Sequence, residues 1–166
     1  MPERKTIERA RKDKREGKAP STQAGEFVRE EMEHIREGKH GARSTKQAIA
    51  IGLSKARRAG VELAPPKKGE ASERTRKSAK RAEEKGQSGD RSVSRTRSRA
   101  VSGALKREGH SAASKSALSK QARSAARRRS ATDRSAAARK ASRTKGPAER
   151  SAAAKKAART RAKNRG

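Results

Sequence analysis

The side chains with the clearest potential chemistry are the lysines and arginines of the C-terminal half. Residues 91–166 contain 24 basic and 3 acidic residues, so they carry +21 of the chain's net charge of +30. A Lys or Arg that meets a phosphate releases condensed counterions, and such binding needs no particular base sequence. We therefore expect this segment to bind nucleic acid. The side chains that we expect to carry the binding are Arg127, Arg128, Arg129, Arg134, Arg139, Lys140, Arg143, Arg150, Lys155, Lys156, Arg159 and Arg161.

The composition favours duplex DNA over single strands. Proteins that bind single strands stack bases on aromatic side chains, and Phe27 is the one Phe, Tyr or Trp of this chain. Base reading in the major groove uses a defined recognition helix, whereas here Lys and Arg are spread around every Ala-rich stretch. The expected binding is therefore independent of sequence. RNA is the alternative partner, because arginine also stacks on unpaired bases.

Residues suited to metal binding or catalysis are scarce. His34 and His40 flank an expected turn, His110 is the third histidine, and the chain has no cysteine. The histidines show no paired ligand spacing, so the sequence predicts no metal site and no cofactor. An acid–base pair of His34 with Glu30 or Glu37 would lie on an exposed helix without a pocket to shift a pKa. We expect no catalytic residues and no enzyme activity.

Serine and threonine alternate with arginine over residues 91–99, RSVSRTRSR. This pattern is typical of basic tails that kinases modify, and each phosphate would cancel up to about two positive charges. The alternative is that small hydroxyl residues keep a basic segment soluble. The sequence leaves both interpretations open.

We expect the secondary structure that positions these residues to have low stability, because only 28% of the 166 residues are hydrophobic and 40% are charged. So little apolar area does not offset the ordering entropy of a globular enzyme. The predicted fold class is mostly α and disordered: a short αα-hairpin head and a conditionally helical Ala/Ser/Arg/Lys-rich tail. The predicted organisation is a basic arm over 1–20, the hairpin over 21–64, a Pro/Gly/charged linker over 65–90 and the tail over 91–166.

Pro20 with Ser21 or Thr22 should open the first helix of the hairpin. The helix should end before Gly38, a residue suited to the left-handed conformation that follows helices. The second should begin at Ser44, which forms a capping-box pattern with Gln47. It should end at Gly60. Apolar residues recur near helical spacing in both segments.

Phe27, Ile49 and Leu53 belong to these apolar stripes. We expect the hairpin to be marginally stable, so that a homodimer through it, or packing with residues 101–105, would add the missing apolar area. The alternative function is a protein-interaction module in which the same three residues dock a partner and the tail only localises the protein.

The tail contains an internal repeat. Residues 133–145 and 149–161 match at nine of thirteen positions with a period of sixteen, and Gly146-Pro147 separates the copies. The longest apolar cluster, residues 48–53, is far below the roughly 20 residues that span a bilayer. The first residues have no apolar run, so we expect no signal peptide and a cytoplasmic protein.

Two resemblances follow from these motifs. The stretch 25–60, and above all KQAIAIGLSKARRAG over 46–60, resembles a family of small, highly basic bacterial proteins of unknown function, some of them catalogued as plasmid stabilisation proteins. The resemblance implies a bacterial source but no activity. The tail SAAARKASRTKGPAERSAAAKKAARTRAKNRG is similar in composition to the tails of linker histones and bacterial histone-like proteins. That likeness implies DNA condensation at the nucleoid.

Overall fold

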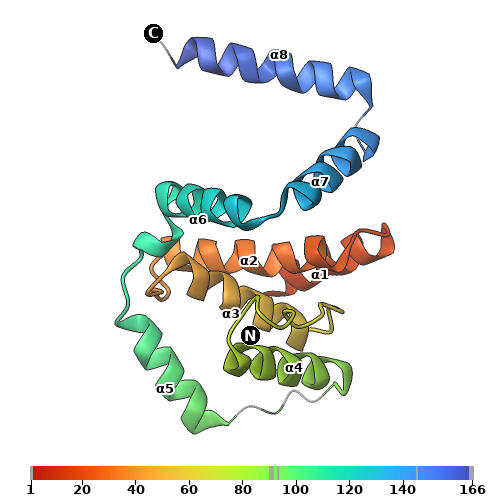
Figure 1. Cartoon of the computed structure of the whole chain (residues 1–166). Helices are drawn as coiled ribbons and strands as arrows, with labels where there is room; N and C mark the ends of the chain where they lie inside the picture. Colours follow the sequence, from red (N-terminus) through yellow and green to blue (C-terminus); the bar gives the residue numbers. More distant parts are fainter. Residues whose placement is uncertain (1, 90–91, 93, 145, 165–166) are drawn as a thin grey trace. The chain divides into compact units, whose positions relative to one another are not determined.

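The computed structural model describes residues 2–89, 92, 94–144 and 146–164. In this part the chain forms eight α-helices and one short 3₁₀ helix, η1 (Figure 1). Their bounds are α1 Arg4–Arg15, α2 Pro20–Arg36, α3 Thr45–Arg58, α4 Glu73–Gln87, α5 Arg95–Lys106, η1 Ser111–Ala113, α6 Lys115–Arg128, α7 Ala131–Thr144 and α8 Pro147–Lys163. The Cα positions divide the chain into two compact units, residues 1–121 and 122–166.

The core of the first unit is built on the pair α2 and α3, with α1 packed on α2 and α4 packed on α3. The two central helices approach so closely that a Cβ atom at Gly52 would lie 2.7 Å from Val28 Cα. Two apolar clusters fill the spaces around this contact. One consists of Met32, Ile35, Ala42, Ala48, Ala112 and Ala113, and the other of Ala10, Ala24, Phe27, Ala56 and Val61.

The hairpin helices that the sequence predicts are present, as α2 and α3. Gly38 and Gly60 follow them in the left-handed region, with φ of 75° and 87°. After α2, the amide of Lys39 donates to His34 O at 3.0 Å and the amide of Gly38 donates to Ile35 O at 3.2 Å. These two bonds form a Schellman motif, which satisfies the last carbonyls of the helix.

The capping box at the start of α3 is confirmed in one half and shifted in the other. Ser44 Oγ accepts from the amide of Gln47 at 3.2 Å, as predicted. Gln47 Oε1, however, accepts from the amide of Arg43 at 2.8 Å, one residue before the predicted donor. The side chain thus satisfies the amide that precedes the N-cap.

The prediction of a disordered, conditionally helical tail is wrong. Residues 95–106, 115–128, 131–144 and 147–163 are all helical. The physical reason is local: alanine has the highest helix propensity, and serines at the helix starts accept hydrogen bonds from free backbone amides. Such caps are Ser94, Ser114 and Ser130, which accept from the amides of Arg97, Ala117 and Asp133.

The beginning of the expected tail is part of the first unit. Thr45 Oγ1 donates to Ala112 O at 2.7 Å, and Arg36 Nε donates to Ala113 O at 2.9 Å. The amide of Gly41 donates to Leu105 O at 2.9 Å. Residues 105–113 therefore lie against the α2–α3 turn and contribute two buried alanines to its core.

Helices also occur where we expected irregular segments: α1 lies in the expected N-terminal arm and α4 in the expected linker. The expected linker–tail boundary at 90–91 lies outside the described residues. Among the helices that the structure describes, none is long and apolar enough to cross a membrane.

Candidate nucleic-acid interface

The second unit consists of the end of α6 and the helices α7 and α8, and their starts are fixed by local chemistry. Ser130 caps α7: its Oγ accepts from the amide of Asp133 at 3.0 Å and donates to Asp133 Oδ2 at 2.7 Å. Helix α8 begins at Pro147, whose missing N–H costs nothing in the first turn. Glu149 lies in that first turn, where a carboxylate favours the helix dipole.

Each of the twelve basic residues predicted from the sequence is exposed. No described residue from 122 to 164 is buried, so this unit presents side chains to solvent on all sides of its helices. The residues are placed as follows: Arg127 and Arg128 end α6 and Arg129 follows it; Arg134, Arg139, Lys140 and Arg143 lie on α7; Arg150, Lys155, Lys156, Arg159 and Arg161 lie on α8.

The repeat gives α7 and α8 the same arrangement of cations. Arg139, Lys140 and Arg143 on α7 correspond to Lys155, Lys156 and Arg159 on α8. Positions i, i+1 and i+4 fall within about 100° of the helix circumference, so each trio lies on one side of its helix. Lys145, the last residue of the first copy, lies outside the described residues.

The two units differ in how many of their cations are already paired. In the first unit, ion pairs such as Arg9–Glu26 at 2.7 Å and Lys14–Glu62 at 2.8 Å neutralise basic side chains. Arg57 is a structural cation: it is buried, and its Nε donates to Leu63 O at 2.9 Å. That burial lowers the pKa of Arg57.

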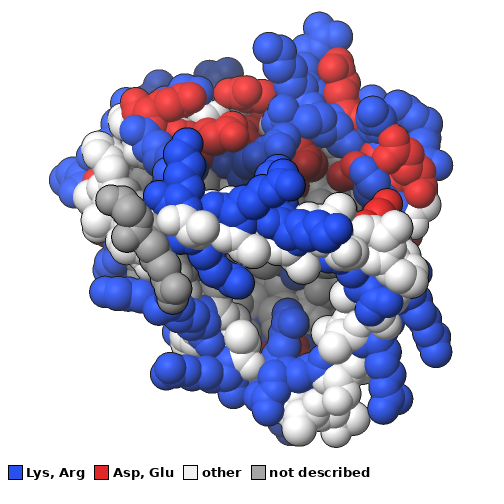
Figure 2. All heavy atoms as spheres, turned by 90° about the horizontal axis from the view of Figure 1, so that it is seen from above, with Lys and Arg blue, Asp and Glu red and all other residues white. Residues whose placement is uncertain are grey.

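Apart from Lys140, the described Lys and Arg side chains from 95 to 163 form no ion pair with a carboxylate. Arg134 donates to the backbone carbonyl of Arg129 at 3.0 Å. Cations without a carboxylate partner need no internal ion pair to be broken before they meet a phosphate. Figure 2 shows Lys and Arg side chains over much of the displayed face, with Asp and Glu gathered in a smaller part of it.

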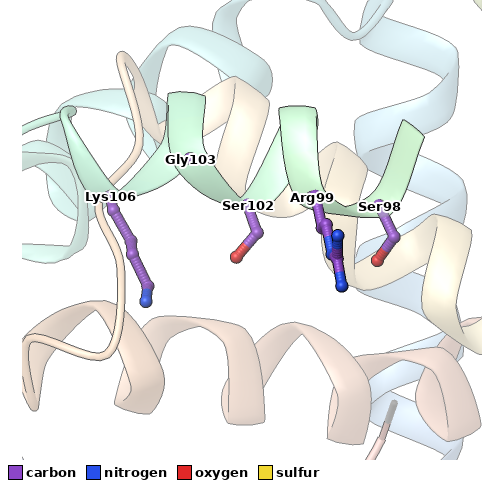
Figure 3. Close-up of a pocket in the computed structure, with 5 residues that line it drawn as sticks. All are labelled: Ser98, Arg99, Ser102, Gly103 and Lys106. Carbon is purple, nitrogen blue, oxygen red and sulfur yellow. The ribbon is translucent and has the colours of Figure 1, made fainter. Parts of the chain in front are cut away.

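A shallow hollow on α5 adds a feature that sequence reasoning missed. Its volume is about 390 Å³, and it is lined by Ser98, Arg99, Ser102, Gly103 and Lys106 (Figure 3). The side chains of the serines and of both cations project from one side of the helix. Cations and hydroxyls in a row over about 12 Å of helix axis suit neighbouring phosphates of a nucleic-acid backbone and not one phosphate. The signal in the sequence was the four-residue spacing of Ser98 and Ser102 next to a basic residue.

The Ser/Thr- and Arg-rich segment 91–99 leads into this helix. Residues 91 and 93 of the segment lie outside the described residues. Ser94 is the N-cap of α5, so its hydroxyl accepts from the amide of Arg97 at 3.4 Å. Thr96 and Ser98 are exposed on the helix.

The three residues predicted for docking lie in or against the core. Phe27 is 1% exposed and belongs to the cluster that it forms with Ala10, Ala24, Ala56 and Val61. Leu53 is half-buried against the same cluster, and Ile49 is half-buried against the other one. The structure thus does not bring these side chains together as one exposed apolar face.

No curated protein and no solved structure matches the chain. A family does match part of it: residues 3–68, which contain α1, α2 and α3, are similar to DUF6496, a family of unknown function.

Proposed function

We propose that the protein binds nucleic acid, and duplex DNA in particular, by neutralising backbone phosphates. The observation that carries the proposal is the second unit: residues 122–166 contain 16 basic and 2 acidic residues, and none of the described ones is buried. A helical segment without buried residues gains little stability from packing. Electrostatic attraction is therefore the main way in which it can bind a partner.

The helical form supports binding to a duplex. Each cation trio extends over about 6 Å along its helix axis, a distance over which a duplex presents several phosphates, one charge per roughly 1.7 Å of its axis. With no aromatic residue in this unit, stacking on splayed bases lacks its usual platform. The hollow on α5 offers a further phosphate contact in the first unit. Such a protein would coat DNA at the nucleoid of the cytoplasm.

The docking alternative has less support. One of its three residues, Phe27, is buried within its own unit, and a docking residue must be accessible to the partner. Binding to RNA would use the same contacts to phosphates, so the affinities for RNA and for duplex DNA must be compared by experiment.

The test is the affinity of the full-length protein for duplex DNA, single-stranded DNA and a structured RNA at several salt concentrations. A six-fold variant replaces the two trios by glutamine: Arg139→Gln, Lys140→Gln, Arg143→Gln, Lys155→Gln, Lys156→Gln and Arg159→Gln. The slope of log K against log salt for duplex DNA should flatten by about 0.9 for each phosphate that the variant no longer neutralises, at most about 5 in total. The loss of affinity should be equal for unrelated DNA sequences.

The matched control removes the same charge from exposed side chains of the first unit: Lys5→Gln, Arg11→Gln, Lys46→Gln, Arg74→Gln, Lys77→Gln and Arg81→Gln. For this control, the slope of log K against log salt should stay close to that of the unchanged protein. An equal loss in both variants would show that total charge, not the second unit, carries binding. Tighter binding to RNA than to duplex DNA would refute the preference for DNA.

A further inference from the structure

A cluster of one carboxylate and two imidazoles lies where α2 ends and turns toward α3. The cluster consists of Glu31, His34 and His40, and one potential ligand atom from each lies within 4.8 Å of the other two. The ring centroids of the two histidines are 6.2 Å apart. The exposed fractions of the side chains are 0% for Glu31, 13% for His34 and 17% for His40.

The local fold explains why these residues meet. Glu31 and His34 are three residues apart on α2, so they lie on the same side of the helix. The Schellman motif at Gly38 then reverses the chain, and His40 returns to the end of the same helix. Sequence spacing alone does not reveal this, because the turn and not a helical period brings the second imidazole close.

Glu31 is a buried charge with incomplete compensation. Its oxygens lie 2.5 Å from Lys55 Nζ and 3.3 Å from His40 Nε2, yet neither receives a hydrogen bond of good geometry in the described part of the chain. A buried carboxylate without hydrogen bonds is costly. The side of Glu31 that faces His40 is therefore where a further cation gains most.

Each imidazole has one ring nitrogen within hydrogen-bond distance of a neighbouring oxygen. His40 Nδ1 lies 3.1 Å from Gly41 O, and since a carbonyl only accepts, Nδ1 is the donor. In the neutral ring the lone pair of His40 is then on Nε2, which faces the carboxylate oxygen Glu31 Oε1. Two electron-rich atoms repel each other, so a cation between them stabilises the contact. His34 Nε2 lies 2.9 Å from Glu3 Oε1. A carboxylate partner on Nε2 leaves the lone pair on Nδ1.

These are the two outer-sphere arrangements that orient metal-binding histidines, a backbone carbonyl on one ring and a carboxylate on the other. Zn–N and Zn–O bonds of about 2.0–2.2 Å place two ligands of a tetrahedral ion roughly 3.3–3.5 Å apart. The His40 Nε2–Glu31 Oε1 distance of 3.3 Å already agrees with that separation. The third ligand atom, within 4.8 Å, needs a shift of at most roughly 1.5 Å.

We propose that Glu31, His34 and His40 bind a divalent transition metal, Zn²⁺ in particular, with water as the fourth ligand. Lys55 stays on the second oxygen of Glu31 and Glu3 orients His34. The ion lies between His40 Nε2 and Glu31 Oε1 and ties the turn after α2 to the helix itself. This site is separate from the basic residues of the second unit.

The test is titration of the full-length, chelator-treated protein with ZnCl₂, followed by calorimetry for affinity and native mass spectrometry for stoichiometry. We expect one ion per chain. His40→Gln should weaken binding by about 100-fold or more, and the outer-sphere variant Glu3→Gln by about 10-fold. The matched control His110→Gln, which removes the third histidine, should leave the affinity unchanged. Circular dichroism of each variant without metal checks that the helices persist.

Co²⁺ in place of Zn²⁺ gives a second readout, because a tetrahedral site produces intense visible absorption that His40→Gln should abolish. The proposal is overturned by an absence of stoichiometric binding, or by equal affinity of His40→Gln and the unchanged protein. It is also overturned if Glu3→Gln abolishes binding while Glu31→Gln keeps it, since the ion would then lie in the neighbouring group of Glu3, Glu30 and His34.

Discussion

Substitution of two helical glycines by alanine should change stability in opposite directions. Gly25 on α2 has no atom within 4 Å of a built Cβ, whereas at Gly52 on α3 the new atom would lie 2.7 Å from Val28 Cα and 3.0 Å from Val28 N. In a helix interior, alanine is favoured over glycine by about 0.8–1.0 kcal/mol. Gly25→Ala should therefore stabilise the first unit by up to about that amount.

For Gly52→Ala the same gain is opposed by overpacking, which costs about 1–3 kcal/mol. The cost should lie in the upper part of this range, because the close atoms belong to the backbone of Val28 and no rotamer change moves them away. We expect a net loss of roughly 1–2 kcal/mol, hence a difference between the two variants of about 2–3 kcal/mol.

The assay is urea unfolding of the two full-length variants, followed by circular dichroism and fitted to the cooperative step. The midpoint should fall for Gly52→Ala and rise for Gly25→Ala, with equal slopes. A Gly52→Ala variant as stable as the unchanged protein, or more so, would refute the close approach of α2 and α3.

Three further substitutions test individual hydrogen bonds and ion pairs. Ser130→Ala removes the cap of α7 and should destabilise that helix by about 0.5–2 kcal/mol; hydrogen exchange of the first-turn amides should quicken there and nowhere else. Lys55→Met leaves the fully buried Glu31 carboxylate without its closest cation and should cost about 3–5 kcal/mol in urea unfolding; a neutral result would show that the pair is open to water. The hydrogen bond from Lys14 lowers the pKa of Glu62 below 4.5, so the stabilisation by this pair is present above pH 4.5 and is lost as the pH falls through the lowered value. Lys14→Met should return the Glu62 pKa toward 4.5 in an NMR titration, and an unchanged pKa would contradict the ion pair.

The hairpin could be predicted from the sequence because its signals are local and agree with one another. Proline at the first position of α2, glycine after each helix and serine before α3 act within one turn of the backbone. Helices α1 and α4 were missed, and the tail helices were expected only as conditional ones, for the opposite reason. In a chain so rich in serine, a cap such as Ser72 before α4 does not stand out from its neighbours, and the positive charges pointed to disorder.

Of the two candidate sites, one could be predicted from the sequence and the other could not. The basic residues of α7 and α8 could be found because exposed charge depends on composition and little on folding. The meeting of His34 with His40 depends on the turn at Gly38 and on the packing that buries Glu31. Packing makes neighbours of residues that are distant in the sequence, and the spacing of residues along the chain does not reveal such contacts.

The repeat in the second unit has a consequence for how this chain can change in length. Each copy, 133–145 or 149–161, carries five basic residues and one acidic residue, a net +4. In neither copy is a described residue buried. Deleting or duplicating one sixteen-residue period would therefore remove or add +4 of charge and about one helix without opening a cavity elsewhere. The length of this unit can thus change by whole repeats, each of which adds or removes a fixed amount of charge.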